Sequence, residues 1–157
     1  IFKKPVGKKI LYMYAGFPMN TLKSSTCTGR IGEFFAMYML EKHGIECHHV
    51  DRSGVDLWCQ SHDGTMFTLQ VKSAYELELG RKKGIRRRYS FNLRASKVAD
   101  FYMFVALEKE RIIVKTPDEL GDRTGSQISP RTFTEEKMAE GLHRLKTFRM
   151  EDRLQPQ

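Results

Sequence analysis

The sequence lacks the features that mark membrane and secreted proteins. No apolar run reaches the roughly 18 residues that a membrane-spanning helix needs. No charged start followed by an apolar stretch and a small-residue cleavage site marks a secretory signal. The cysteines are Cys27, Cys47 and Cys59, an odd number without metal-type spacing. These absences predict reduced thiols in a cytoplasmic setting, whether prokaryotic, phage or organellar.

Motifs of several enzyme classes are absent as well. The glycines fit no phosphate-cradling loop, and neither Gly-x-Ser-x-Gly nor a Cys–His arrangement suited to acyl transfer occurs. Cys47, His48 and His49 stand together near His43, which raises the possibility of zinc. Only Cys47 and His49 would share a face of a strand, and no second pair of ligands follows elsewhere. The pattern therefore favours ordinary strand residues over a zinc site, and no small-molecule cofactor is expected.

Positive charge is what the chain has in excess. Its 157 residues carry a formal net charge of +8, which favours a polyanionic partner, nucleic acid first. A dense run of cations is followed at once by Tyr89 and Phe91. Such a run is also typical of a solvated loop, but the adjoining aromatics favour contact with DNA. The predicted DNA-binding residues are Arg81, Lys82, Lys83, Arg86, Arg87 and Arg88.

The hydrophobic pattern predicts an α/β (α+β) fold with a central mixed β-sheet flanked by helices. A first helix is expected over 30–43, ended by Gly44. Its expected buried face consists of Ile31, Phe34, Phe35 and Tyr38, which recur at helical spacing. A late helix is expected over 134–145, capped by Thr134. Strands are expected at 46–50, 55–60, 66–73, 89–93, 100–107 and 111–115, the last two as a hairpin.

The length favours one domain over residues 1–157. Residues 1–28 form a basic lead-in in which 10–14 is an expected strand. Residues 29–115 form the expected catalytic core, and 116–157 a C-terminal loop and helix. Within the last part, 121–131 is expected to be a mobile loop, because it is rich in Gly, Ser, Pro and charge.

Polar residues interrupt the apolar pattern of two neighbouring predicted strands. Gln70 and Lys72 are two residues apart, so they project from the same face of a strand. Antiparallel pairing with the preceding strand would bring Asp56 beside Gln70. Carboxylate and amide oxygens suit magnesium or manganese. A lysine beside them can orient or deprotonate a water. The chemistry that this set predicts is metal-assisted phosphodiester hydrolysis.

Three segments together carry a resemblance to a known superfamily. Gly32-Glu33, then Ser53-Gly54-Val55-Asp56, then Gln70-Val71-Lys72 resemble the motifs of PD-(D/E)XK nucleases over residues 29–107. The resemblance is closest to the branch of group I intron homing endonucleases in which Gln-x-Lys replaces Glu-x-Lys. It extends to archaeal and phage Holliday-junction resolvases. Val55 stands where many members have Pro.

The resemblance implies a restriction-endonuclease-like domain and assigns roles to its residues. Asp56, Gln70, the Val71 carbonyl and Glu33 would hold Mg²⁺, with Mn²⁺ able to substitute. Lys72 would position or activate the attacking water. The implied catalytic residues are Glu33, Asp56, Gln70 and Lys72.

The sequence leaves three interpretations open. The first is a magnesium-dependent DNA endonuclease that acts at specific sites or at branched DNA, as a homodimer or higher oligomer. The second is a catalytically inactive DNA-binding module that keeps the fold and has lost activity through Gln70. For the motif residues themselves, the non-catalytic alternative is a nucleic-acid-binding fold in which Asp56 and Lys72 form a buried ion pair and Gln70 is exposed at a sheet edge. The third, an RNA-binding accessory protein, rests on charge alone.

Overall fold

The structure, a computed structural model, describes residues 25–79 and 86–153. The strand expected at 10–14, most of the basic lead-in and the cations Arg81, Lys82 and Lys83 lie outside the described residues. No helix in the described part of the chain is long and apolar enough to cross a membrane.

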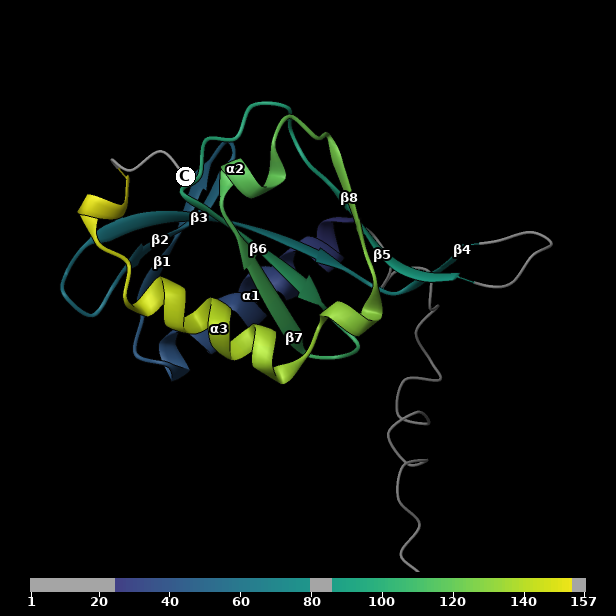
Figure 1. The fold of residues 1–157 in the computed structure, drawn as a ribbon, viewed down its shortest axis with the longest axis horizontal. Helices are drawn as coiled ribbons and strands as arrows, with labels where there is room; N and C mark the ends of the chain where they lie inside the picture. Colours follow the sequence, from purple (N-terminus) through teal and green to yellow (C-terminus); the bar gives the residue numbers. More distant parts are fainter. Residues whose placement is uncertain (1–24, 80–85, 154–157) are drawn as a thin grey trace, which may run out of the picture.

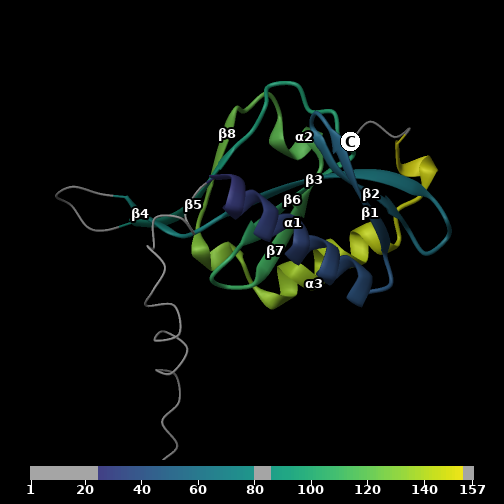
Figure 2. The same ribbon diagram turned by 180° about the vertical axis from the view of Figure 1, so that it is seen from behind.

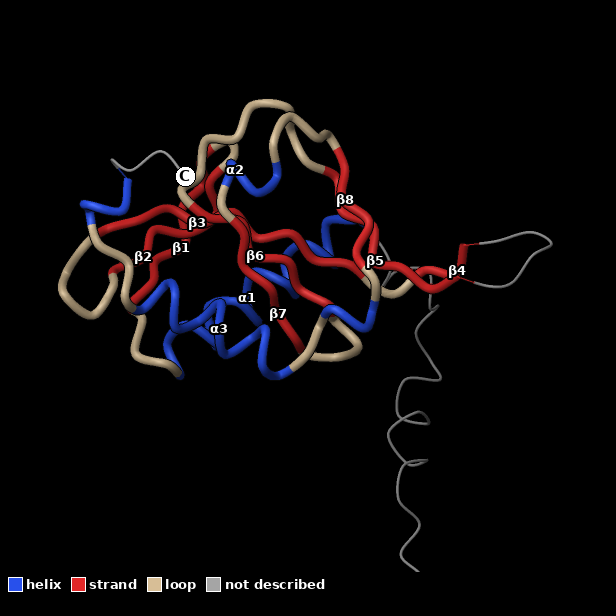
Figure 3. The backbone as a smooth tube through the Cα atoms, viewed as in Figure 1, coloured by secondary structure: helices blue, strands red, loops and turns tan. Residues whose placement is uncertain are grey.

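A mixed five-stranded sheet forms the centre of the fold (Figures 1 and 3). Its strands lie in the order β1-β2-β3-β6-β7, and all neighbours are antiparallel except β3 and β6, which are parallel. This arrangement confirms the predicted α+β fold, including the hairpin of the last two strands. The bounds are β1 Glu46–Arg52, β2 Val55–Gln60, β3 Met66–Ala74, β6 Phe101–Ala106 and β7 Arg111–Lys115.

Two helices, α1 (Ser25–Lys42) and α3 (Glu135–Lys146), cover one face of this sheet (Figures 1 and 2). Alternate strand residues point toward them, because side chains along a strand alternate between faces. Phe67, Leu69 and Val71 of β3 pack in this core with Leu40 of α1 and Leu145 of α3. Helix α3 begins as predicted, with the Thr134 hydroxyl accepting the backbone N–H of Lys137 at 3.1 Å.

Of the four residues expected on the buried face of the first helix, Phe35 packs against the core, but the prediction for the other three was wrong. Ile31, Phe34 and Tyr38 are exposed, whereas the small residues Gly32 and Ala36 are buried against the sheet. The reason is a close approach between α1 and β3: a Cβ added at Gly32 would lie 2.3 Å from the Ser73 Cβ. Only a small-residue face fits this spacing, so the larger side chains turn outward.

The C-terminal end of α1 follows from local backbone chemistry. At its other end, the described part of the helix already includes Ser25, so the helix reaches further toward the N-terminus than expected. It ends as predicted at Gly44, whose φ of +75° is the left-handed conformation that glycine favours. The backbone N–H of Ile45 donates to the Leu40 carbonyl and that of Gly44 to the Glu41 carbonyl, each at 3.0 Å. This pair of hydrogen bonds is a Schellman cap.

A second, smaller layer covers the opposite face of the five-stranded sheet. It contains a three-stranded sheet in the order β4-β5-β8. Its aromatic residues Tyr89, Phe91 and Phe133 pack on Tyr102 and Phe104 of β6. The bounds are β4 Leu77–Leu79, β5 Arg86–Asn92 and β8 Gly125–Ile128, with the short helices α2 Pro117–Leu120, η1 Pro130–Thr132 and η2 Met150–Arg153.

Three sequence expectations change in this layer. The strand expected over 89–93 starts at Arg86, because β4 pairs with its first residues. The expected loop 121–131 contains β8, which pairs with β5 from Tyr89 to Asn92. β4 and α2 had not been expected. Each of these elements is too short to show periodicity, and pairing or capping by distant residues holds it in place.

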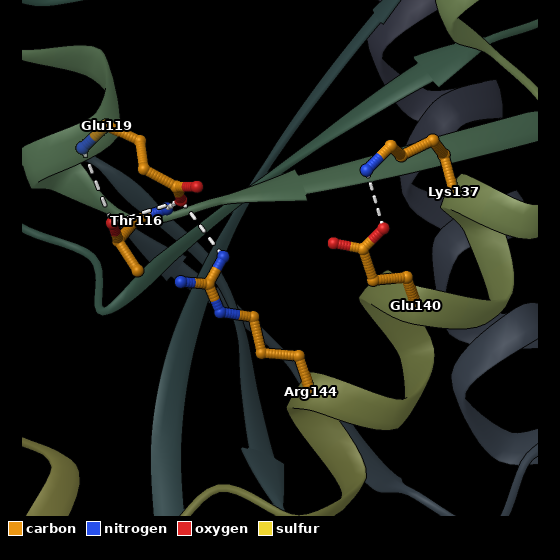
Figure 4. Close-up of polar contacts among 5 residues, drawn as sticks. All are labelled: Thr116, Glu119, Lys137, Glu140 and Arg144. Carbon is orange, nitrogen blue, oxygen red and sulfur yellow. Dashed lines mark hydrogen bonds and ion pairs between the residues drawn. The ribbon is translucent and has the colours of Figure 1, made fainter.

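Charged side chains join α2 to α3 (Figure 4). Glu119 closes a capping box with Thr116, whose backbone N–H donates to its carboxylate at 2.6 Å. The same carboxylate accepts from Arg144 of α3 at 3.0 Å. One turn away, Lys137 and Glu140 form a more exposed ion pair along α3.

Candidate active site

The carboxylate of Asp56 links β2 to the middle of the Gln-Val-Lys motif on β3. Its Oδ2 accepts a hydrogen bond from the backbone N–H of Val71 at 2.7 Å. The paired residues of the two strands end at Leu57 and Leu69, and the register continued by one residue places Asp56 across from Gln70. The sequence motif is therefore assembled at one end of the β2–β3 hairpin, as antiparallel pairing predicted.

Gln70 and Lys72 lie on the sheet face opposite α1 and α3. In the parallel register, Gln70 lies beside Tyr102 and Lys72 beside Phe104, and both aromatic residues belong to the second core. Gln70 is only 6% exposed, and β3 has a strand on each side. The non-catalytic alternative for the motif residues placed Gln70 exposed at a sheet edge, and the structure contradicts that placement.

Glu33 and Asp56 line the same cleft, although they come from α1 and β2. The cleft has a volume of about 370 Å³. Glu33 Oε2 lies 3.0 Å from His49 Nε2, which holds the carboxylate at the cleft wall. The lining residues are Ser25, Thr26, Gly29, Arg30, Glu33, His49, Val50, Arg52 and Asp56.

The environment of Asp56 disfavours its negative charge. Burial raises the pKa of the Asp56 carboxyl, and the nearby Glu33 carboxylate raises it further. The hydrogen bond from Val71, together with the charges of Lys72 and His49, opposes these effects without cancelling them. Arg30 and Arg52 also line this cleft, but the charge of the Asp56 carboxylate itself stays under-compensated, and a cation bound beside it would relieve this.

The environment of Lys72 disfavours its positive charge. Burial lowers the pKa of Lys72, Asp56 opposes this shift, and Arg94 adds to it. Asp56 and Lys72 are not among the ion pairs of the described residues in which a nitrogen and a carboxylate oxygen lie within 4.0 Å. The two charges interact across a longer distance, so the buried ion pair of the non-catalytic alternative is not formed.

Arg94 is a site residue that the sequence did not reveal. It follows β5, and its Nη1 donates to the Ser53 hydroxyl in the turn that leads into Asp56. The ammonium of Lys97 fixes the loop that carries it, donating to the carbonyls of Arg94, Ala95 and Arg123 at 2.6, 3.1 and 2.8 Å. Arg94 lies outside the basic run and 22 residues beyond Lys72 (94 − 72), so nothing in the sequence connects it with the motif.

The predicted DNA-binding residues that the structure describes lie on a projecting hairpin. Arg86, Arg87 and Arg88 belong to β5, where they pair with β4. β4 and the adjoining end of β5 extend away from the five-stranded sheet (Figures 1 and 2). Arg87 is exposed and Arg88 is partly exposed. The basic run is therefore partly strand, because β5 begins at Arg86 and not at Tyr89 as expected.

The residues considered for zinc do not converge. Cys47 is buried in the core, and burial, together with Glu41, raises the pKa of its thiol to about 12. His43 Nδ1 contacts the Met39 carbonyl at 2.8 Å, and His49 contacts Glu33. Among residues 25–79 and 86–153, no group of three or more His, Cys, Asp or Glu side chains is arranged to hold a metal ion. A metal at Asp56 would therefore require amide, carbonyl, water or phosphate oxygens as further ligands.

The fold and the assembled motif define a nuclease-like α+β domain. Among solved structures, the chain is similar to that of a bacterial homing endonuclease, I-Ssp6803I, with a TM-score of 0.57. The two sequences are 21% identical, and the match covers 80% of this chain and 99% of that one. The likeness establishes that the fold resembles that of a homing endonuclease. No protein family profile and no curated protein sequence matches the chain.

Proposed function

We propose that the chain is a magnesium-dependent DNA endonuclease of the PD-(D/E)XK superfamily. The observation that carries this proposal is the hydrogen bond between Asp56 and the Val71 backbone, which brings the acidic residue against the Gln-Val-Lys motif. The fold shared with a homing endonuclease supports the same reaction class. Cleavage at specific DNA sites is the form of the reaction that this neighbour favours.

The donor set at the site fits magnesium. Asp56 would supply a carboxylate from the cleft that Glu33 also lines, and Gln70 and Val71 of the neighbouring strand, which are not among the lining residues, would supply an amide and a carbonyl oxygen. The raised pKa of Asp56, caused by burial and by Glu33, supports a cation at this point. Mg²⁺ keeps several waters and is commonly bound by one or two carboxylates plus substrate phosphate, so a neutral Gln70 is compatible with it. When bound, Mg²⁺ would polarise the phosphate, and Mn²⁺ would substitute.

Two cations of the chain act on the phosphodiester and on the attacking water. Lys72 holds the water, and its lowered pKa raises the fraction of neutral amine, which is the form that can accept a proton. Arg94 is exposed and anchored by Ser53, so its guanidinium can bind a phosphate oxygen, and it adds to the lowering of the Lys72 pKa that burial causes.

DNA binding rests on the basic residues. Arg81, Lys82, Lys83, Arg86, Arg87 and Arg88 would contact the DNA backbone, which is a sequence-independent and salt-sensitive interaction. Because cleavage of two strands needs two active sites, a homodimer is the simplest assembly that supplies them.

The rival function is a DNA-binding module without activity, which the neutral Gln70 favours. The test is nicking of a supercoiled plasmid in Mg²⁺, compared with EDTA and with the Asp56→Ala variant. A four-way junction and a linear duplex of matched sequence then separate structure-specific from site-specific cleavage. Magnesium-dependent cleavage that Asp56→Ala abolishes, at similar DNA affinity, supports the endonuclease. Tight DNA binding without cleavage in either metal would establish the rival.

A further inference from the structure

The outer face of α1 carries an apolar stripe formed by Ile31, Phe34 and Tyr38, which we call the α1 stripe. These side chains are 36%, 64% and 58% exposed. At about 100° per residue they lie within roughly 60° of one another around the helix axis. Aromatic side chains contribute large areas when they are buried, so two exposed ones on a single helical face indicate a surface that binds a partner.

Charged residues border the α1 stripe in a self-complementary order. Arg30 and Glu41 are 11 positions apart (41 − 30), which corresponds to three full helical turns plus about 20°. They therefore lie on the same flank of the helix, at opposite ends of the stripe. Glu41 is fixed in place because its Oε1 accepts the backbone N–H of Cys47 at 3.0 Å. On the other flank, the Lys42 ammonium lies over the Tyr38 ring, 5.5 Å from its centroid.

We propose that the α1 stripe binds the α1 stripe of a second copy of this chain, with the two helices antiparallel about a two-fold axis. The two-fold axis passes between the two helices, at the level of their midpoints. Each flank of one helix then faces the same flank of the other copy. Arg30 then faces Glu41 of the second copy, and Glu41 faces Arg30. Along one helix, the midpoint between Arg30 and Glu41 falls between positions 35 and 36. The midpoint between Phe34 and Tyr38 is position 36, which is half a residue away. The axis that pairs the charges therefore also packs Phe34 against Tyr38 of the second copy.

Charge complementarity of this kind is specific to a second copy. A DNA backbone would be repelled by Glu41, and an anionic membrane surface would favour cations on both flanks. The proposed pairing satisfies both charges while covering the aromatic residues. Because α1 also carries Glu33 on the wall of the candidate active site, the pairing would fix two such sites relative to each other.

Sedimentation of the full chain over a wide concentration range, without DNA or metal, tests this proposal. We expect a dimer whose dissociation constant rises at least about tenfold in Phe34→Asp, since a few buried anchor residues at the centre of an interface carry most of its binding energy. Met150→Asp is the matched control, because Met150 is 55% exposed and lies on η2, away from the stripe. This control should dimerise like the wild type. A monomeric wild type, or a dimer that is insensitive to Phe34→Asp, would overturn the proposal.

A charge exchange tests the two-fold arrangement itself. Arg30→Glu alone and Glu41→Arg alone place like charges opposite each other in a homodimer, so each variant should be monomeric. An equimolar mixture restores both attractive pairs and should form a heterodimer. The two positions are about 16 Å apart along one helix, so the rescue cannot occur within a single chain. A mixture that stays monomeric while both variants retain wild-type circular dichroism would overturn the arrangement. If Glu41→Arg fails to fold, the Phe34→Asp comparison decides. Because dimerisation is measured without cleavage, its failure leaves the proposed function standing.

Discussion

The Asp56 carboxylate accepts the backbone N–H of Val71 at 2.7 Å, yet the pKa of this carboxyl is raised because burial and Glu33 outweigh that hydrogen bond. The charged form of Asp56 is thus held in the fold at the expense of stability. The pKa of the Asp56 carboxyl is higher in the folded than in the unfolded state. The stability that this carboxyl contributes is therefore fully present below its unfolded-state pKa, and it is lost as the pH rises through the folded-state pKa. The protein should therefore be more stable in acid than at high pH as far as Asp56 is concerned, because the folded state disfavours its carboxylate form.

Asp56→Asn should abolish cleavage without lowering stability. The amide keeps an oxygen that can accept the Val71 N–H, and it removes the buried charge. We expect the melting temperature at pH 7 to equal or exceed that of the wild type, and the difference to disappear in acid, where Asp56 is protonated. Thermal unfolding monitored by circular dichroism at the two pH values gives the comparison. A clear loss of stability at pH 7 would show that the charge itself is structural.

Gln70→Glu should make stability depend on magnesium. Gln70 is 6% exposed and lies across from Asp56. A carboxylate at position 70 would therefore add a second buried negative charge beside Asp56, whose own charge burial and Glu33 already disfavour. Without metal we expect a lower melting temperature than that of the wild type. With Mg²⁺ the added charge tightens binding, and a ligand that binds only the folded state stabilises it. Melting curves in EDTA and in a magnesium series test this. A variant that Mg²⁺ stabilises no more than it does the wild type would argue against Gln70 as a ligand.

Gly32→Ala should disturb the fold at the contact between α1 and β3. The added Cβ would lie 2.3 Å from both the Ser73 Cβ and its hydroxyl, and such overpacking typically costs about 1–3 kcal/mol. Gly29→Ala on the same helix is the control, because no other atom lies within 4 Å of its added Cβ. Helix propensity predicts that this control is more stable by about 0.5–1 kcal/mol. Urea unfolding of both variants measures the difference, and equal effects would contradict the close approach.

The sequence predicted the sheet well because its strands are long enough to show their pattern. The alternation in β2 and β3 and the apolar run of β6 gave their bounds to within one residue. The rotation of α1 was not predictable from its apolar residues, since it depends on the distance to Ser73 on a strand more than 40 positions away. β8 has the composition of a loop and becomes a strand only because β5 supplies a hydrogen-bonding partner.

The candidate site was predictable to the extent that its chemistry is local in sequence. Gln70 and Lys72 are fixed to one face by strand geometry, and the turn at residues 61–65 fixes the pairing of β2 with β3 that places Asp56 across from Gln70. Arg94 and His49 could not be assigned, because their contacts with Ser53 and Glu33 arise from loop and helix placement. The burial of Gln70 likewise depends on β6, which follows 31 residues later (101 − 70).

Glu119→Gln should cost more stability than Glu140→Gln. Although burial opposes ionisation of Glu119, hydrogen bonds from Thr116 and the charge of Arg144 outweigh it and lower the pKa. The stability that Glu119 contributes is therefore present above the ordinary glutamate pKa, about 4.3, and is lost as the pH falls through its lowered value. We expect a loss of about 0.5–1.5 kcal/mol at pH 7 that vanishes in acid. The exposed Lys137–Glu140 pair should contribute less than about 0.5 kcal/mol. Equal losses in urea unfolding would contradict this role of the capping box.

Lys72→Ala and Arg94→Ala should separate chemistry from DNA binding. Removing Lys72 should slow single-turnover cleavage by about 100- to 1000-fold at nearly unchanged affinity, because one preorganised group is lost from the transition state.

Arg94→Ala should change the pH dependence of cleavage. Burial and Arg94 lower the Lys72 pKa, so removing the guanidinium raises it, and the rise of rate with pH should move to higher pH. Part of the lost rate should return in alkaline buffer. Arg87→Ala removes an exposed cation from β5 and should weaken binding while the midpoint of the pH profile stays in place. An unshifted midpoint in Arg94→Ala would mean that Lys72 does not accept the proton.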